Sequence, residues 1–400
     1  MPVSRRSFLR IPGNERTGPT TGAFLAARGL EAYFADTQQR GRAARPPLPP
    51  GVEEIRISSN ENPLGPGKTA LEAILGKFPE AGRYPFNSSP GENDLVAAIA
   101  AKQKVKPENV VLAAGSQEIL KNAVRAFASP TKALVTAAPT FENPTNVAKR
   151  LKFGLKEIKV DSACRLDVEA MIDAVKGAGL LFFNNPNNPT ATVHSASTVR
   201  DMVERVRRAS PDTVILIDEA YHDYVTDPAY ESAIPLAMNT PNVFVARTFS
   251  KAYGMAGLRI GYAIGAENTV KPLARLKMPY NVSVFGVAAA IASLNDPKHI
   301  EDERARNTEV RAFTVKALQE IGVKPTDSQA NFLFVDIHRP AKDFRDACAK
   351  SGVMVGRDFP PFEKTHCRIS IGTMDEMQKA VDVFRAALRT TTSAPAGDKR

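Results

Sequence analysis

The chain has 400 residues, which suits two domains sharing a boundary, and its 43% hydrophobic and 24% charged residues exclude global disorder. No apolar run approaches the roughly 18 residues of a membrane-spanning helix, and three cysteines without a CxxC pair exclude a disulfide framework and a structural zinc site. Lysine and arginine outnumber aspartate and glutamate by 53 to 43, but residues 1–50 hold half of that excess. Residues 51–400 are therefore too weakly basic for a nucleic-acid groove. Their mild positive charge suits a small anionic ligand.

The N-terminal residues are predicted to be an address and a linker rather than part of the fold. Residues 4–10 read SRRSFLR, which resembles the twin-arginine export motif. The apolar stretch at residues 22–27 is short and has charged neighbours, which is poor for an export signal. The seven-residue match nevertheless favours export of a folded protein to the periplasm. A cytoplasmic protein with a flexible basic leader is the alternative. We expect the proline-rich residues 46–51 to form a stiff linker and residues 390–400 a frayed tail.

Short apolar runs alternate with helical patterns between residues 90 and 285. The helical patterns cover residues 95–102, 118–127 and 199–208. Apolar strands separated by helices predict an α/β fold with a mostly parallel sheet buried on both faces. The runs lie at residues 110–113, 133–136, 180–183, 214–217, 243–246 and 260–263.

The pattern changes after about residue 285. A long helical stretch covers residues 285–318, and a last helix covers residues 374–388. Between them lie short apolar runs at residues 332–335, 353–355 and 367–371. This part of the chain predicts a smaller α+β domain.

The residues that follow each run are candidates for a site, because ligands of parallel sheets bind at the carboxyl ends of the strands. Asp218 follows the fourth run; a buried carboxylate there needs a cationic or donor partner, although a capping or salt-bridged role would also explain it. Gly115 and Ser116 open a helix after the first run and make a phosphate seat or a plain helix cap. Residues 184–190 form an amide-rich loop or an ordinary turn, and residues 247–259 gather hydroxyls, a lysine and arginines.

Together these segments resemble the fold-type I pyridoxal-phosphate aminotransferases of the aspartate-aminotransferase superfamily, over residues 57–388. Within it the chain is most similar to the histidinol-phosphate aminotransferase branch, in residues 58–65, 83–85 and 250–259. The resemblance implies a mostly parallel seven-stranded sheet in a large cofactor-binding domain, plus a smaller α+β domain. The expected parts are a leader and linker (1–56), an N-terminal segment of the small domain (57–80), the large domain (81–285), the small domain (286–389) and the tail (390–400).

The same resemblance assigns residues to the cofactor, pyridoxal 5′-phosphate. Lys251 would form the Schiff base and then act as the general base. Asp218 would pair with the pyridine nitrogen, and Tyr221 and Asn188 would donate to the ring oxygen. Phe141 would stack on the ring. The phosphate would be held by Gly115, Ser116, Gln117, Thr248, Ser250 and Arg259.

The resemblance also assigns the substrate contacts. Arg368 and Arg357 would bind anionic groups of the substrate. Tyr84 and Tyr280 would reach the site of a neighbouring subunit, which implies a homodimer with shared sites. The segment around Asn60 would fold over the substrate, and Asn331 would line the site. The expected reaction is ping-pong transfer of an amino group from an anionic donor, histidinol phosphate or an amino acid, to a 2-oxo acid. These small molecules are the expected partners, without a metal, nucleic acid or membrane.

Three positions depart from the family pattern and leave the substrate open. Ala191 stands where glycine is common, Phe141 where tyrosine is usual, and Gln117 where an acidic residue or threonine is typical. The arginines would equally fit an aromatic amino-acid donor, and threonine-phosphate decarboxylases resemble this branch, so an aromatic amino-acid aminotransferase and such a decarboxylase are the alternatives. A non-catalytic cofactor-binding protein is a remote alternative, against which the intact Lys251 and Asp218 argue.

Overall fold

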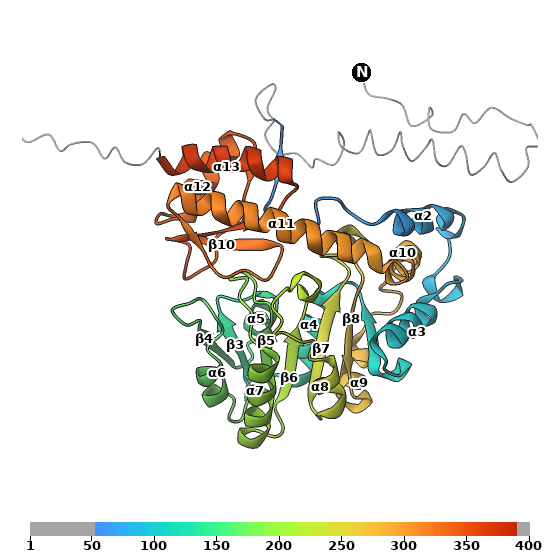
Figure 1. Cartoon of the computed structure of the whole chain (residues 1–400). Helices are drawn as coiled ribbons and strands as arrows, with labels where there is room; N and C mark the ends of the chain where they lie inside the picture. Colours follow the sequence, from blue (N-terminus) through green and yellow to red (C-terminus); the bar gives the residue numbers. More distant parts are fainter. Residues whose placement is uncertain (1–52, 390–400) are drawn as a thin grey trace, which may run out of the picture. The chain divides into compact units, whose positions relative to one another are not determined.

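The computed structural model describes residues 53–389 (Figure 1). The predicted export motif, most of the predicted leader and linker, and the predicted tail lie outside these residues. Within the described range no helix has both the length and the apolar character needed to cross a membrane. Residues 55–56, which we expected in the linker, form a short strand β1 (Ile55–Arg56) that pairs in parallel with β11 (Val353–Met354).

A seven-stranded, mostly parallel sheet forms the centre of the larger part of the fold and confirms the predicted α/β class. All neighbouring strands are parallel except β8, which is antiparallel to both of its neighbours. Six strands match the six predicted apolar runs. The seventh, β4, escaped prediction because it is an edge strand whose lysines and glutamate face solvent. In spatial order the strands are β2 (Val110–Ala113), β8 (Gly261–Gly265), β7 (Val243–Thr248), β6 (Val214–Asp218), β5 (Leu180–Asn184), β3 (Leu134–Ala138) and β4 (Leu155–Lys159).

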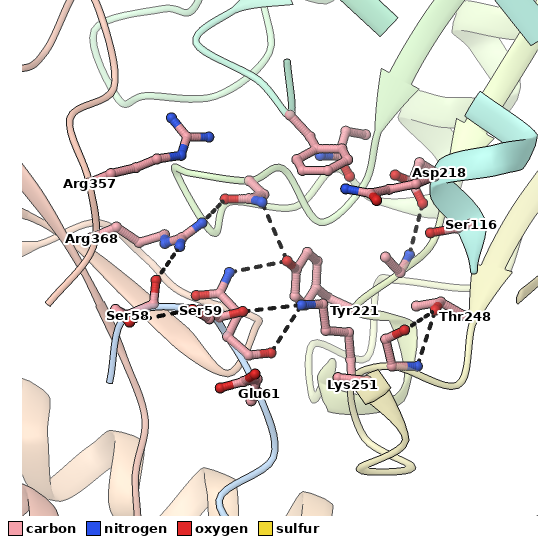
Figure 2. A pocket seen from close by; sticks show the side chains of 18 of the residues that line it. Ser58, Ser59, Glu61, Ser116, Asp218, Tyr221, Thr248, Lys251, Arg357 and Arg368 are labelled. Carbon is pink, nitrogen blue, oxygen red and sulfur yellow. Dashed lines mark hydrogen bonds between the residues drawn. The ribbon is translucent and has the colours of Figure 1, made fainter. Parts of the chain in front are cut away.

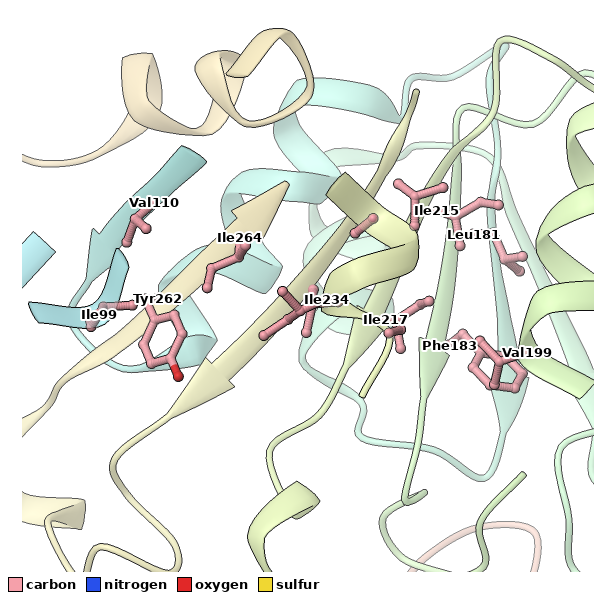
Figure 3. Close-up of a cluster of buried hydrophobic side chains, with 14 of the residues drawn as sticks. Ile99, Val110, Leu181, Phe183, Val199, Ile215, Ile217, Ile234, Tyr262 and Ile264 are labelled. Atoms are coloured by element: carbon pink, nitrogen blue, oxygen red, sulfur yellow. The ribbon is translucent and has the colours of Figure 1, made fainter. Parts of the chain in front are cut away.

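Successive residues of a strand point to opposite sides of the sheet. Apolar side chains lie on both faces here, and helices cover both. Ile215 and Ile217 pack on one face with α2, α3, α6, α7, α8 and α10 (Figure 3), whereas Leu216 packs on the other with α4, α5 and α9. The helices are α2 (Lys68–Gly76), α3 (Glu92–Gln103), α4 (Ser116–Phe127), α5 (Asn143–Leu151), α6 (Val168–Ala174), α7 (Ala196–Ala209), α8 (Ile234–Asn239), α9 (Glu267–Leu276) and α10 (Val284–Leu294).

A second core gathers around a small antiparallel sheet of order β12-β10-β9. Figure 1 shows α11, α12 and α13 beside β10. The predicted helix over residues 285–318 is in fact two helices, because Asp296 caps α11 and Pro297 is its first residue. The elements are β9 (Lys324–Pro325), β10 (Phe332–Asp336), β12 (His366–Ser370), α11 (Pro297–Ile321), α12 (Ala341–Lys350) and α13 (Met374–Arg389).

The expected domain boundaries do not coincide with the division between the two cores. Ile57 packs in the core of the small sheet, but Ala70 of α2 packs in the core of the large one, so the segment 57–80 is shared. The expected boundary at residue 285 falls inside α10, whose buried residues also join the large core. Short 3-10 helices complete the fold: η2 (Phe78–Glu80), η3 (Pro85–Asn87), η4 (Pro107–Asn109), η5 (His222–Tyr224) and η6 (Ala256–Leu258).

A buried ion pair fastens the ends of β6 and β7. Asp218 lies opposite Ala246 in the sheet, which brings the next residues, Glu219 and Arg247, together. The Arg247 Nη2 and Nε atoms donate to Glu219 Oε2 at 2.7 and 3.0 Å, and Ser232 bonds to both partners. Glu219 is 2% exposed and Arg247 8%, so each charge depends on the other.

We predict that Arg247→Met lowers the free energy of unfolding by about 3–5 kcal/mol, because it leaves the Glu219 carboxylate buried without a cation. Urea unfolding measures the loss. The exposed pair of Arg200 and Glu231 provides the control, since Arg200→Met should cost less than about 1 kcal/mol. Adding Glu219→Gln to Arg247→Met should recover stability; a double variant as unstable as Arg247→Met would contradict the account.

Candidate active site

A cavity of about 490 Å³ lies at the carboxyl ends of the central strands, where loops of the large sheet meet residues 58–61 and the small sheet (Figure 2). Most of the predicted site residues line it, although they come from segments as distant in sequence as residues 60 and 368. Those that line the cavity are Asn60, Ser116, Gln117, Phe141, Asn188, Asp218, Tyr221, Thr248, Ser250, Lys251, Arg259, Arg357 and Arg368.

Asp218 brings a buried carboxylate to the end of β6. Its Oδ1 accepts a hydrogen bond from the Ala220 N–H at 3.2 Å, and among the described residues no lysine or arginine lies within ion-pair distance of it. Burial, and to a lesser extent the charge of Glu219, raise the pKa of Asp218 to about 7. A carboxylate in this state is stabilised by any cation or N–H donor placed in the cavity.

Lys251 brings an amine into the same cavity from the loop after β7. Burial first, and then the charge of Arg368, lower the pKa of Lys251 to about 8. Its Nζ donates to the carbonyl oxygens of Asn60 at 3.1 Å and Ser59 at 3.3 Å (Figure 2). A larger fraction of this amine is therefore neutral near physiological pH than of an ordinary lysine, which suits a nucleophile or general base.

Tyr221 presents its hydroxyl to the cavity between two amides. Its oxygen accepts from Asn60 Nδ2 at 3.1 Å and from Asn188 Nδ2 at 3.4 Å, which leaves its own proton free to be donated. Burial raises the pKa of Tyr221 to about 12, so the phenol stays protonated. The network extends to Arg368, whose Nη1 donates to Asn188 Oδ1 at 2.8 Å and whose Nη2 donates to the Ser58 carbonyl at 2.6 Å.

The start of α4 forms an anion seat with the end of β7. Gly115 has φ +78°, a conformation that favours glycine, and a Cβ atom there would also displace the Arg259 guanidinium. The Arg259 Nη1 donates to Ser250 Oγ at 3.3 Å, and Thr248 Oγ1 donates to the same oxygen at 2.9 Å. Free N–H groups, hydroxyls and a guanidinium thus converge as a phosphate requires, although Gly115 itself does not line the cavity.

Three arginines surround the opposite side of the cavity, and the sequence indicated only two of them. Arg357 pairs with Glu142, and Arg368 Nε is buried without a hydrogen-bond partner. Arg345 also lines the cavity and pairs with Asp358 at 2.6 Å. It escaped prediction because it lies on an ordinary amphipathic helix, α12, and nothing in the local sequence distinguishes it from a surface arginine.

Three predicted substrate residues do not line the cavity in this chain. Tyr84 and Tyr280 are 61% and 54% exposed and pack on each other, with 4.8 Å between ring centroids, outside the cavity. Asn331 is fully buried behind residues 60–61, where its Nδ2 donates to the Asn60 carbonyl at 3.1 Å. Its expected place lining the site is therefore corrected: it supports the segment that does.

The groups present fit pyridoxal phosphate. The anion seat around Ser116 and Arg259 matches a phosphate, and the unpaired Asp218 carboxylate matches a protonated ring nitrogen. Lys251 supplies an amine for an aldehyde, and the Tyr221 proton is available to a ring oxygen. The fit rests on the match between these groups and the polar atoms of the cofactor.

The fold and the cavity define an α/β enzyme able to hold a phosphorylated carbonyl compound next to Lys251. Residues 52–384 match the family of class I and II aminotransferases, and the chain belongs to that family. A histidinol-phosphate aminotransferase of Moorella thermoacetica is 34% identical over 343 residues, which cover 84% of this chain and 86% of that protein. That of Bacillus subtilis is 32% identical over 336 residues, 84% and 91% of the two chains. The crystal structure of histidinol-phosphate aminotransferase from Sinorhizobium meliloti in complex with pyridoxal-5′-phosphate matches with a TM-score of 0.78 and 26% identity, over 95% of this chain and 99% of that one.

We predict that Asp218→Asn stabilises the cofactor-free protein at pH 8, by up to about 4 kcal/mol. The folded-state pKa of Asp218 is raised to about 7, so the stability that this carboxyl contributes is present below its ordinary pKa and is lost as the pH rises through 7. The gain from Asp218→Asn should therefore fall to less than half at pH 5. Urea unfolding at both pH values measures it, with the exposed Asp212→Asn as the control. A destabilised variant at pH 8 would contradict the account.

Proposed function

We propose that this aminotransferase moves an amino group from an anionic donor to a 2-oxo acid, and that histidinol phosphate is the first donor to test. The observation that carries the proposal is the placement of Lys251 and Asp218 in one cavity, with an anion seat at the start of α4 and three arginines opposite. The family membership supports the reaction, and the relatives' names support the donor.

Pyridoxal phosphate would be held by residues of the large sheet. Ser116, Thr248, Ser250 and Arg259 would bind its phosphate, and Asp218 its ring nitrogen. When bound, the cofactor supplies an aldehyde that exchanges amines and a ring that accepts electrons from the donor carbon. The negative charge of Asp218, costly when unpartnered, would then face a cation, and the cation in turn would lower the pKa of this carboxyl.

The proton transfers would fall to Lys251, with Tyr221 as a hydrogen-bond donor beside it. With its pKa lowered to about 8, the Lys251 amine can take a proton from the donor Cα in the first half-reaction and deliver a proton to the former carbonyl carbon of the 2-oxo acid in the second. Tyr221 stays neutral and acts as a hydrogen-bond donor, because its pKa is raised to about 12. The lysine thus serves both half-reactions of a ping-pong cycle.

The arginines support an anionic donor. Arg357 and Arg345 each have one carboxylate partner, Glu142 and Asp358, which a phosphate or carboxylate of the substrate could replace. Arg368 is more deeply buried, and burial lowers its pKa to about 10. The same set fits an aromatic amino acid or threonine phosphate. Export directed by residues 4–10 would separate the enzyme from cytoplasmic histidine synthesis and favour an amino-acid donor.

We also propose a homodimer with shared sites. The aromatic patch, defined here as Tyr84, Phe86, Met278 and Tyr280, is between 54% and 68% exposed in the single chain. Its three rings contact one another, with centroids 4.8 to 5.9 Å apart. An exposed apolar cluster of this kind is typical of an interface, and a second copy would cover it.

The test is a titration of the cofactor-loaded protein, followed by visible absorbance. We expect histidinol phosphate to remove the visible band of the bound cofactor and to give a keto product. Lys251→Ala should lose turnover by at least about a thousandfold, because the general base is removed. Removal of the band by aromatic amino acids alone would show that an amino acid, not histidinol phosphate, is the donor. Release of carbon dioxide from threonine phosphate or an amino acid, which carry a carboxyl group, would show decarboxylation instead of transamination. Failure to bind the cofactor would contradict the whole assignment.

A further inference from the structure

Glu118, in the first turn of α4, holds two separate segments with one carboxylate. Its Oε2 accepts from the Ala114 N–H at 2.7 Å, directly before Gly115 of the anion seat. The same oxygen accepts from Asn281 Nδ2 at 2.6 Å, and Oε1 accepts from the Met278 N–H at 3.3 Å. One side chain therefore joins the anion seat to residues 277–281, which lie in the connection between α9 and α10.

Residues 277–281 carry half of the aromatic patch. Tyr280 has φ +57°, a backbone conformation that bulky residues rarely adopt, so the surrounding contacts must hold it. Lys277 pairs with Glu92 at 2.5 Å, and Asn122 Nδ2 donates to the Leu276 carbonyl at 3.3 Å. These two contacts hold only the beginning of the segment, whereas Glu118 holds the residues on both sides of Tyr280.

We propose that Glu118 is a positioning residue that couples cofactor binding to self-association; this inference rests on the proposed cofactor and homodimer. An anion at the start of α4 binds Arg259, whose Nη2 donates to the Ala114 carbonyl at 3.1 Å, and so fixes the residue whose N–H bonds to the Glu118 carboxylate. The ordered carboxylate holds Met278 and Asn281 and so fixes Tyr280 in the aromatic patch that meets the second copy. Because such coupling is reciprocal, the second copy tightens cofactor binding by the same factor.

The coupling factor is the ratio of the dimer dissociation constants without and with pyridoxal phosphate. We would measure it by fluorescence-detected sedimentation over a dilution series. For the wild-type chain we expect a ratio of about fivefold or more. Asn281→Ala removes one of the two bonds from Glu118 to the loop and leaves Ala114 bonded to Glu118, so it should lower the ratio below the wild-type value. Glu118→Ala removes both bonds and should lower the ratio further, toward one. Lys121→Ala, on the exposed side of α4, is the control that should keep the wild-type ratio.

The ratio separates coupling from a general weakening of the interface, since a variant that only weakens the dimer changes both constants equally. A ratio for Asn281→Ala and Glu118→Ala equal to that of the wild-type chain overturns the proposal. A wild-type ratio of one, with dimers in both states, overturns the coupling alone. A chain that stays monomeric in both states overturns the homodimer as well, and a chain that binds no pyridoxal phosphate overturns the cofactor.

Discussion

The buried carboxylate of Asp218 is the constraint on which the site depends. The parallel sheet brings it to the end of β6, and the adjacent buried pair of Glu219 and Arg247 fixes the position of that strand end relative to β7. Lys251 follows β7 by three residues and therefore reaches the same cavity. The protein thus holds a carboxylate that is poorly satisfied by its own side chains, and the neighbouring ion pair fixes the position of the strand end that carries it.

The two ends of the cavity differ in chemistry, which gives a bound ligand one direction. At the start of α4, backbone N–H groups and hydroxyls favour a phosphate, and Gly115 allows Arg259 to approach. At the other end, Arg357 and Arg368 come from the small sheet and its loops. Residues 58–61 lie between them, held by Arg368 and Lys251 through backbone carbonyls. Any movement of this segment therefore acts on both functional cations.

The sequence predicted six strands of the large sheet and the polar residues at their ends. An apolar run and the polar residues that follow it are both visible in the local sequence. It did not predict β4, whose polar residues give no apolar run, or the break between α10 and α11, where a capping aspartate and a proline end a continuous pattern. Arg345 gave no signal because its role arises only when α12 packs beside the cavity. Asn331 and Gly115 do not line the cavity: Asn331 supports residues 60–61 through the Asn60 carbonyl, and Gly115 gives the turn before α4 its positive φ. Ala191, where the family commonly has glycine, does adopt the positive φ of +63° that explains the usual glycine.

The central claim is that Lys251 is the amine that receives the cofactor, opposite Asp218. The most direct measurement is borohydride reduction of the protein loaded with pyridoxal phosphate, followed by proteolysis and mass spectrometry. The account predicts that the added phosphopyridoxyl mass lies on the peptide containing Lys251, and that Lys251→Ala abolishes it. Modification confined to surface lysines, at the same level in the wild-type chain and in Lys251→Ala, would contradict the account.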